Sequence, residues 1–167
     1  MIVNRSKVFS SLLAGLATFS TLFAGNPKVV QPIQFNHQYH IDEIELECYD
    51  CHLQVETQRR ASIPNIYQCA ECHEDMDTDI EEAQKVVDHI SEGKKIPWIQ
   101  VHRVTDHAYF SHQRHVTLGE IDCSTCHGNV AERTEPFTEP YVEITMDWCK
   151  SCHKGNLVTQ DCNACHR

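Results

Sequence analysis

The chain has 167 residues, a length typical of one domain, and its aromatic content is only 8%. Its 24 acidic and 14 basic residues give a formal charge of −10, which argues against nucleic acid, whose binders carry basic patches. The acidic surface suits a basic protein partner, and it also accounts for simple solubility. Ten cysteines in so short a chain indicate that disulfides, metals or covalent cofactors supplement a thin apolar core.

Residues 1–24 have the pattern of a targeting segment. Arg5 and Lys7 form a short basic region, and the apolar stretch 8–23 is shorter than the roughly 20 residues that a membrane span needs. The stretch ends at a mediocre cleavage site after Ala24. A cleaved signal peptide and a retained N-terminal membrane anchor are both open alternatives. In either case we expect residues 25–167 on the periplasmic side of an inner membrane.

The cysteines fall into five Cys-x-x-Cys-His motifs, with none left over. Two thiols at this spacing reach the two vinyl groups of one haem, and the histidine that follows supplies the proximal nitrogen to its iron. Zinc sites and disulfides also use paired cysteines, but neither explains a histidine after the second cysteine in every motif. We therefore predict five covalently attached c-type haems, held by Cys48, Cys51 and His52 (motif I), Cys69, Cys72 and His73 (motif II), Cys123, Cys126 and His127 (motif III), Cys149, Cys152 and His153 (motif IV), and Cys162, Cys165 and His166 (motif V).

The histidines outside the motifs provide at least one further ligand for each haem. The second axial ligand of an exported electron-transfer haem is usually His or Met, so this surplus predicts bis-His ligation and lower potentials than His/Met ligation gives. The segment 35–40 recurs as 110–115, and a motif begins 11 residues after the first histidine of each copy. We predict two di-haem modules, about 35–73 and 110–153, joined by a linker 74–109 and followed by a fifth haem at 162–166.

The repeated segment also supplies most of the distal candidates. Its two histidines are three residues apart, so they lie on adjacent sides of one helical turn and can face two different irons. We expect the first histidine of each pair to serve the motif that follows it, and the second to reach another haem. These candidates are His37, His40, His112 and His115. For the fifth distal ligand the first choice is His102, and the weaker candidates are His107, His89 and Met146.

The expected fold is mostly α with extensive loop and little strand, with short helices around a core made largely of porphyrin. The clearest helix covers residues 81–91, where Asp77 or Asp79 can cap the start and Gly93 can end it. Each motif should lie on a short helical turn, because its cysteines and histidine must converge on one ring. The proline-containing stretch 132–140 is expected to be loop.

These residues resemble the multihaem cytochromes c of the c3 and c7 class, in which a Phe-x-His-x-x-His segment precedes a Cys-x-x-Cys-His motif. The likeness is closest to the pentahaem subunit of alternative complex III, a quinol:electron-acceptor oxidoreductase. It is best over residues 96–167 and weaker over 33–75. The stretches that carry it are Trp98-Ile-Gln-Val-His102, Tyr109-Phe-Ser-His-Gln-Arg-His-Val116, Cys123-Ser-Thr-Cys-His-Gly128 and Thr145-Met-Asp-Trp-Cys149.

The resemblance implies a series of bis-His haems docked on membrane quinol-oxidising subunits of a respiratory or photosynthetic complex. Such a subunit passes electrons to a soluble cytochrome or oxidase and has no catalysis of its own. Two other functions stay open: a free periplasmic electron shuttle, and a small multihaem reductase with one open haem site. The reductase requires an iron with a free distal position, whereas enough histidines are present to close every position.

Overall fold

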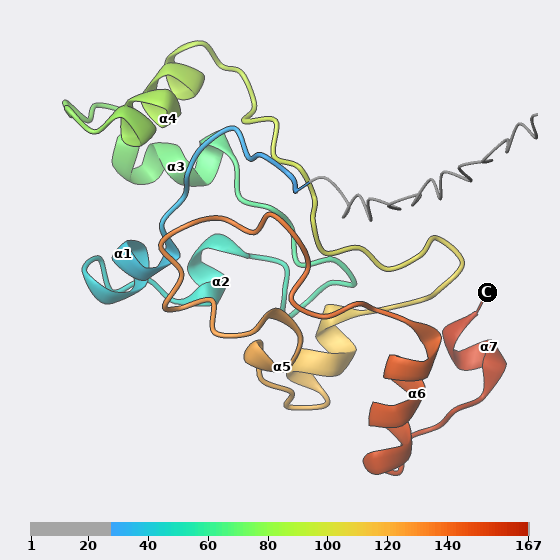
Figure 1. Ribbon diagram of the computed structural model, residues 1–167. Coiled ribbons are helices and arrows are strands. Elements are labelled where there is room, and N and C mark those ends of the chain that lie inside the picture. Colours follow the sequence, from blue (N-terminus) through green and yellow to red (C-terminus); the bar gives the residue numbers. More distant parts are fainter. Residues whose placement is uncertain (1–27, 167) are drawn as a thin grey trace, which may run out of the picture.

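The computed structural model describes residues 28–166, so the predicted leader, residues 1–24, lies outside the described residues (Figure 1). Within this range short helices alternate with long loops, and the one β pairing is an isolated bridge between Ala108 and His166. The expected fold, mostly helical and loop-rich with little strand, is thereby confirmed. The helices in chain order are α1 (His37–Asp42), α2 (Cys48–Cys51), α3 (Ile66–His73), α4 (Glu81–Ser91), the π-helix η1 (Gln113–Thr117), α5 (Ser124–His127), α6 (Met146–Gly155) and α7 (Cys162–Cys165).

Every Cys-x-x-Cys-His motif contains or overlaps a helical turn, as predicted. Motifs I, III and V coincide with the short helices α2, α5 and α7, and motifs II and IV lie within the longer α3 and α6. Local capping explains where the longer helices begin. The side chain of Asn65 accepts a hydrogen bond from the Ile66 amide at the start of α3, and that of Thr145 accepts one from the Trp148 amide at the start of α6.

Helix α4 has the predicted bounds, but its predicted N-cap is wrong. The N-cap is Ile80, without a side-chain cap, and Thr78 Oγ1 accepts a hydrogen bond from the Ile80 amide at 3.1 Å. Neither Asp77 nor Asp79 caps the helix, and the polar side chain next to its start is that of Thr78. Gly93 ends the helix as expected, with a φ of +63° that favours glycine and an amide that donates to the Ile90 carbonyl.

The apolar core of the described residues is small. Ile66 of α3 and Val86 of α4 pack together with Ile33 and Ile96, and these four form the buried aliphatic core of the part of the chain that the structure describes. Burying one such side chain contributes about 1.5–3 kcal/mol, so four of them offset little of the entropy lost on ordering the chain. Much of the interior must therefore be supplied by a group other than the polypeptide.

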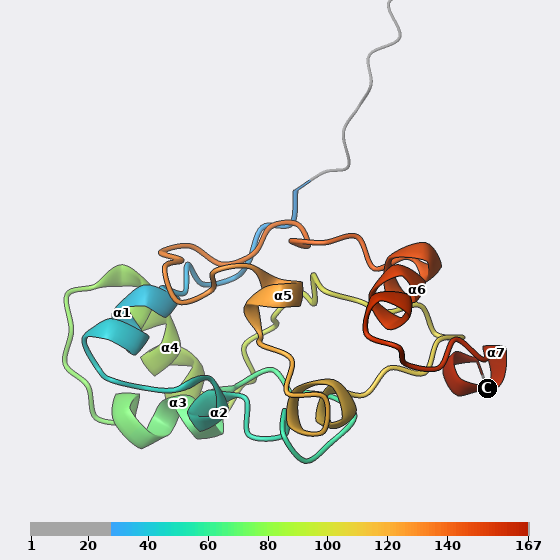
Figure 2. The same ribbon diagram turned by 90° about the horizontal axis from the view of Figure 1, so that it is seen from below.

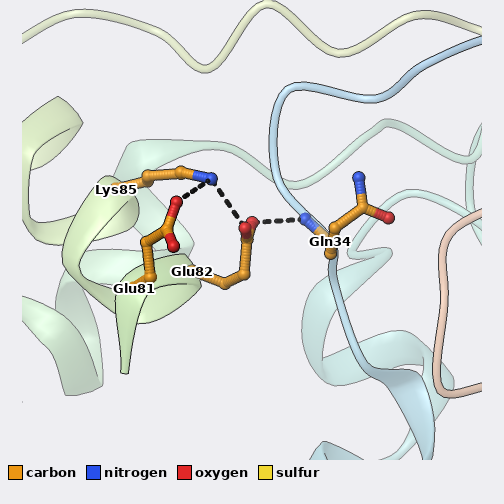
Figure 3. Close-up of polar contacts among 4 residues, drawn as sticks. All are labelled: Gln34, Glu81, Glu82 and Lys85. Atoms are coloured by element: carbon orange, nitrogen blue, oxygen red, sulfur yellow. Dashed lines mark hydrogen bonds and ion pairs between the residues drawn. The ribbon is translucent and has the colours of Figure 1, made fainter. Parts of the chain in front are cut away.

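A polar contact ties the first described segment to α4 (Figure 3). Glu82 Oε2 accepts a hydrogen bond from the Gln34 amide at 2.6 Å, and Lys85 Nζ lies 2.6 Å from Glu82 Oε1 and 3.1 Å from Glu81 Oε1. A charged acceptor at a backbone amide is stronger than a neutral one, so Glu82 fixes this segment beside the α3–α4 pair.

The helices are spread along an elongated arrangement rather than gathered in one bundle. In both views α3 and α4 lie at one end, α2 and α5 lie between, and α6 and α7 lie at the other end (Figures 1 and 2). Over residues 28–166, no helix has the length and hydrophobicity that crossing a membrane takes.

Candidate functional site

Four motif histidines lie next to a histidine from outside the motifs. In each case the partner comes from the repeated segment or from the linker just before its second copy. The ring centroids are 6.4 Å apart for His40 and His73, 6.1 Å for His115 and His153, 6.5 Å for His112 and His127, and 5.6 Å for His107 and His166.

These separations fit two imidazoles that ligate opposite faces of one metal ion. A metal–imidazole bond is about 2.0–2.1 Å long and a ring centroid lies roughly 1.1 Å from its nitrogen, so two such rings are roughly 6.3 Å apart. Three pairs agree with this value within about 0.2 Å, and the pair at motif V is about 0.7 Å shorter. The residues present therefore fit an iron held between two histidines.

The two copies of the repeated segment have nearly the same local geometry. The His40–His73 rings are tilted by 37° and the His115–His153 rings by 35°. In each copy the leading phenylalanine stacks on the second histidine, with a centroid distance of 4.5 Å, and it meets the first histidine edge-on. The phenylalanine thus holds both histidines in place, which explains why it belongs to the repeat.

Hydrogen bonds fix the tautomer of six candidate ligands. A backbone carbonyl only accepts, so a ring Nδ1 paired with one carries the hydrogen and leaves the Nε2 lone pair available to a metal. This contact is 2.8–3.2 Å long throughout. The pairs are His40 with Asn36, His52 with Ser62, His112 with Arg59, His115 with Ser111, His153 with Thr159, and His166 with His107.

His37 lies near enough to His52 of motif I for the two rings to interact electrostatically. Burial, and then the neighbouring His52 ring, lowers the pKa of His37 to about 4. Its Nδ1 and that of His73 are buried without a hydrogen-bond partner in the described residues. Each such buried nitrogen lowers the stability of the fold by about 1–3 kcal/mol. Burial, and then the rings of neighbouring histidines, also lowers the pKa of His127 to about 4. Neutral rings are the form in which histidine ligates a metal.

The structure separates the four candidates for the fifth distal position. His107 lies parallel to His166, with 17° between the rings, although it was a weaker candidate. The first choice, His102, lies edge-on to His127 at 4.5 Å, which is too close for an ion between them, and its Nε2 accepts a hydrogen bond from the Tyr141 amide. Among the described residues, His89 has no ring contact with a motif histidine, and Met146 is 60% exposed.

The sequence alone did not indicate that His107 lies beside His166 of motif V. Motif V lies outside the duplication, so no second copy of it indicates by its spacing which histidine is its partner. The contact arises because the chain at 107–109 runs along motif V, where the Tyr109 amide donates to the Cys165 carbonyl at 2.6 Å.

The ten thiols form no disulfide in the described residues. Within residues 28–166 there is likewise no group of three or more His, Cys, Asp or Glu side chains placed to hold a metal ion. Burial raises the pKa of several of the thiols, among them Cys69 and Cys126, so they are protonated in the polypeptide alone.

Comparison with known proteins identifies the family of the chain. The profile of the class III cytochrome C family matches residues 20–103, and that of cytochrome c7 and related cytochrome c matches residues 108–167. The menaquinone reductase multiheme cytochrome c subunit of Nitratidesulfovibrio vulgaris is 33% identical over 157 residues, covering 81% of this chain and 74% of that protein. Histidine pairing, attachment motifs and sequence similarity together show that the chain belongs to the multihaem cytochromes c of the class III and c7 families.

Proposed function

We propose that this chain carries five covalent c-type haems and serves as an electron-transfer subunit. The observation that carries the proposal is the pairing of motif histidines with histidines outside the motifs at ring separations of 5.6–6.5 Å. A bound haem supplies reversible one-electron transfer. The polypeptide contributes two thioether attachments and two nitrogen ligands for each haem, and its phenylalanines and carbonyls fix the orientation of the rings.

The proposed ligand assignment follows the observed pairs. Each motif histidine would hold the haem iron as the proximal ligand, and its partner from outside the motifs would be the distal one. His107 takes the fifth distal position in place of His102, because its ring is parallel to that of His166 and lies at nearly the required distance. The distal ligands are His37 for motif I, His40 for motif II, His112 for motif III, His115 for motif IV and His107 for motif V.

This assignment favours a carrier over a reductase. A multihaem reductase needs one iron with an open distal position at which substrate binds. The proposed assignment gives every motif a distal histidine, so it would leave no iron with an open position. The assignment does not distinguish a free electron shuttle from a subunit of a membrane complex. These two functions differ in the partner protein and not in the haem sites.

We further propose that the chain works on the periplasmic side of an inner membrane, docked on membrane subunits that exchange electrons with quinone. Support comes from the relative, whose name describes a subunit of a menaquinone reductase. The resemblance to alternative complex III favours quinol oxidation, with electrons passing to a soluble cytochrome or oxidase. The relative's name favours the opposite direction, with electrons passing towards menaquinone.

Two experiments test the proposal. Pyridine haemochrome analysis of the purified protein should give about five haems per chain, with a low-spin spectrum and no carbon monoxide binding. Binding of carbon monoxide by a whole haem equivalent would instead establish an open site and favour the reductase.

The partner subunits and the direction of electron transfer need further measurements. Affinity purification from solubilised membranes should recover membrane subunits, and recovery of the chain alone would favour the free shuttle. In the purified complex, haem reduction by a menaquinol analogue supports quinol oxidation. Loss of electrons from reduced haem to added menaquinone supports the reverse direction.

A further inference from the structure

We propose that the five attachment motifs lie in space in the linear order II–I–III–IV–V, so that the electron path begins and ends at motifs II and V. This inference rests on the proposed function, since it orders the haems that the motifs would hold. It differs from the order in the chain, because motif I, the first in sequence, becomes an interior position.

The junction between the modules lies between motifs I and III. The loop that follows motif I pairs with the segment that precedes motif III. Its Arg59 carbonyl accepts from the His112 amide at 3.0 Å, its Gln58 carbonyl accepts from the Gln113 amide at 3.1 Å, and its Glu56 carbonyl accepts from Thr117 Oγ1 at 2.8 Å. The two modules therefore meet through their first motifs, and their second motifs lie outward.

The thiols of different motifs that lie near each other give the same neighbours. The Cys48 thiol of motif I lies near Cys123 of motif III. The Cys152 thiol of motif IV lies near Cys126 of motif III. Motif I also adjoins motif II, because the Cys51 thiol lies near Cys69.

The two ends of the series are defined by different elements. At one end, motif II lies on α3, which packs against α4 through the small apolar core. At the other end, motif V is held by the chain at 107–109, and the Cys165 thiol adjoins Cys149 of motif IV. Figures 1 and 2 show the same sequence of helices in both views, running from α3 through α2, α5 and α6 to α7.

The order is tested by pulsed dipolar EPR on the haem-loaded protein. A spin label on Ile80→Cys, at the exposed start of α4, reports its distance to each oxidised low-spin haem. A label on Leu157→Cys, which is 96% exposed and lies between motifs IV and V, reports from the other end. The His40→Met, His112→Met and His107→Met substitutions show which EPR signal belongs to which haem, because each substitution changes the spectrum of one haem.

From residue 80 the distances should increase in the order II, I, III, IV, V, and from residue 157 the haem of motif II should be farthest. A haem of motif III that is closer to residue 80 than that of motif I would overturn the inference, and so would a haem of motif V closer than that of motif IV. Ser91→Cys, at the exposed other end of α4, replaces Ile80→Cys if that variant loses haem. Absence of haem from the unmodified chain contradicts the proposed function, whereas five low-spin haems in another order contradict this inference alone.

Discussion

Replacing His107 should open one haem, whereas replacing His102 should open none. The prediction follows from the ring geometry. His107 faces His166 in parallel at 5.6 Å, close to the roughly 6.3 Å expected across an iron. His102 is edge-on to His127 at 4.5 Å, and its Nε2 is occupied by the Tyr141 amide. In His107→Ala about one haem in five should therefore become high-spin and bind carbon monoxide.

The assay is the carbon monoxide difference spectrum of the reduced protein, normalised to haem content, together with the EPR spectrum of the oxidised protein. His89→Ala is the matched control, because the His89 ring contacts no motif histidine in the described residues and its Nδ1 pairs with the Lys94 carbonyl. In His107→Met the spectrum should stay low-spin and one potential should rise, since a thioether ligand raises it. A high-spin haem in His102→Ala and none in His107→Ala would refute the reasoning.

Three further predictions concern folding. In Gly128→Ala the added Cβ would lie 2.7 Å from the Tyr141 ring, at a backbone φ of +66°. We therefore expect the free energy of unfolding of the haem-loaded protein, measured by thermal unfolding, to fall by about 1–3 kcal/mol. Gly155→Ala, whose added Cβ would meet no atom within 4 Å, should leave that free energy unchanged. An equal loss in both variants would contradict this account. The chain expressed without haem attachment should be largely unfolded by circular dichroism, because four buried apolar side chains are a small core, and a cooperative thermal transition in that material would count against it. The pKa of Glu82 is lowered by its hydrogen bonds to Lys85 and then to the Gln34 amide, so its stabilisation is full above its ordinary pKa of about 4.5 and is lost as pH falls through the lowered value. Glu82→Gln should therefore speed amide exchange at Gln34 near neutral pH and have no effect once the carboxylate is protonated, and a difference that persists in acid would exclude this cause.

The local features of the fold could be predicted where a short-range rule governs them. The helix at 81–91 follows from its spacing of apolar residues, and Gly93 ends it because glycine adopts a positive φ at little cost. Its capping residue was predicted wrongly, because Thr78 and the two neighbouring aspartates all have side chains that can accept a hydrogen bond from a backbone amide there. The choice among them depends on the path of the preceding loop.

Tertiary relations were predictable only where the duplication encodes them. The offset of 75 residues indicated that His40 and His115 play equivalent roles, and the structure gives both the same partner geometry. Motif V has no such copy, so the approach of His107 depends on a contact between segments 59 residues apart. The junction through Arg59 and His112 is likewise made by backbone groups, which leave no pattern in the sequence.

The central claim is that all ten cysteines hold haem, two to each of five groups. Intact-mass spectrometry of the mature protein tests it most directly, because thioether-linked haem survives denaturation while zinc and free haem do not. The mass should exceed that of the polypeptide by five haems, and the thiols should resist alkylation. A mass equal to that of the polypeptide alone, or ten thiols free to react, would contradict it.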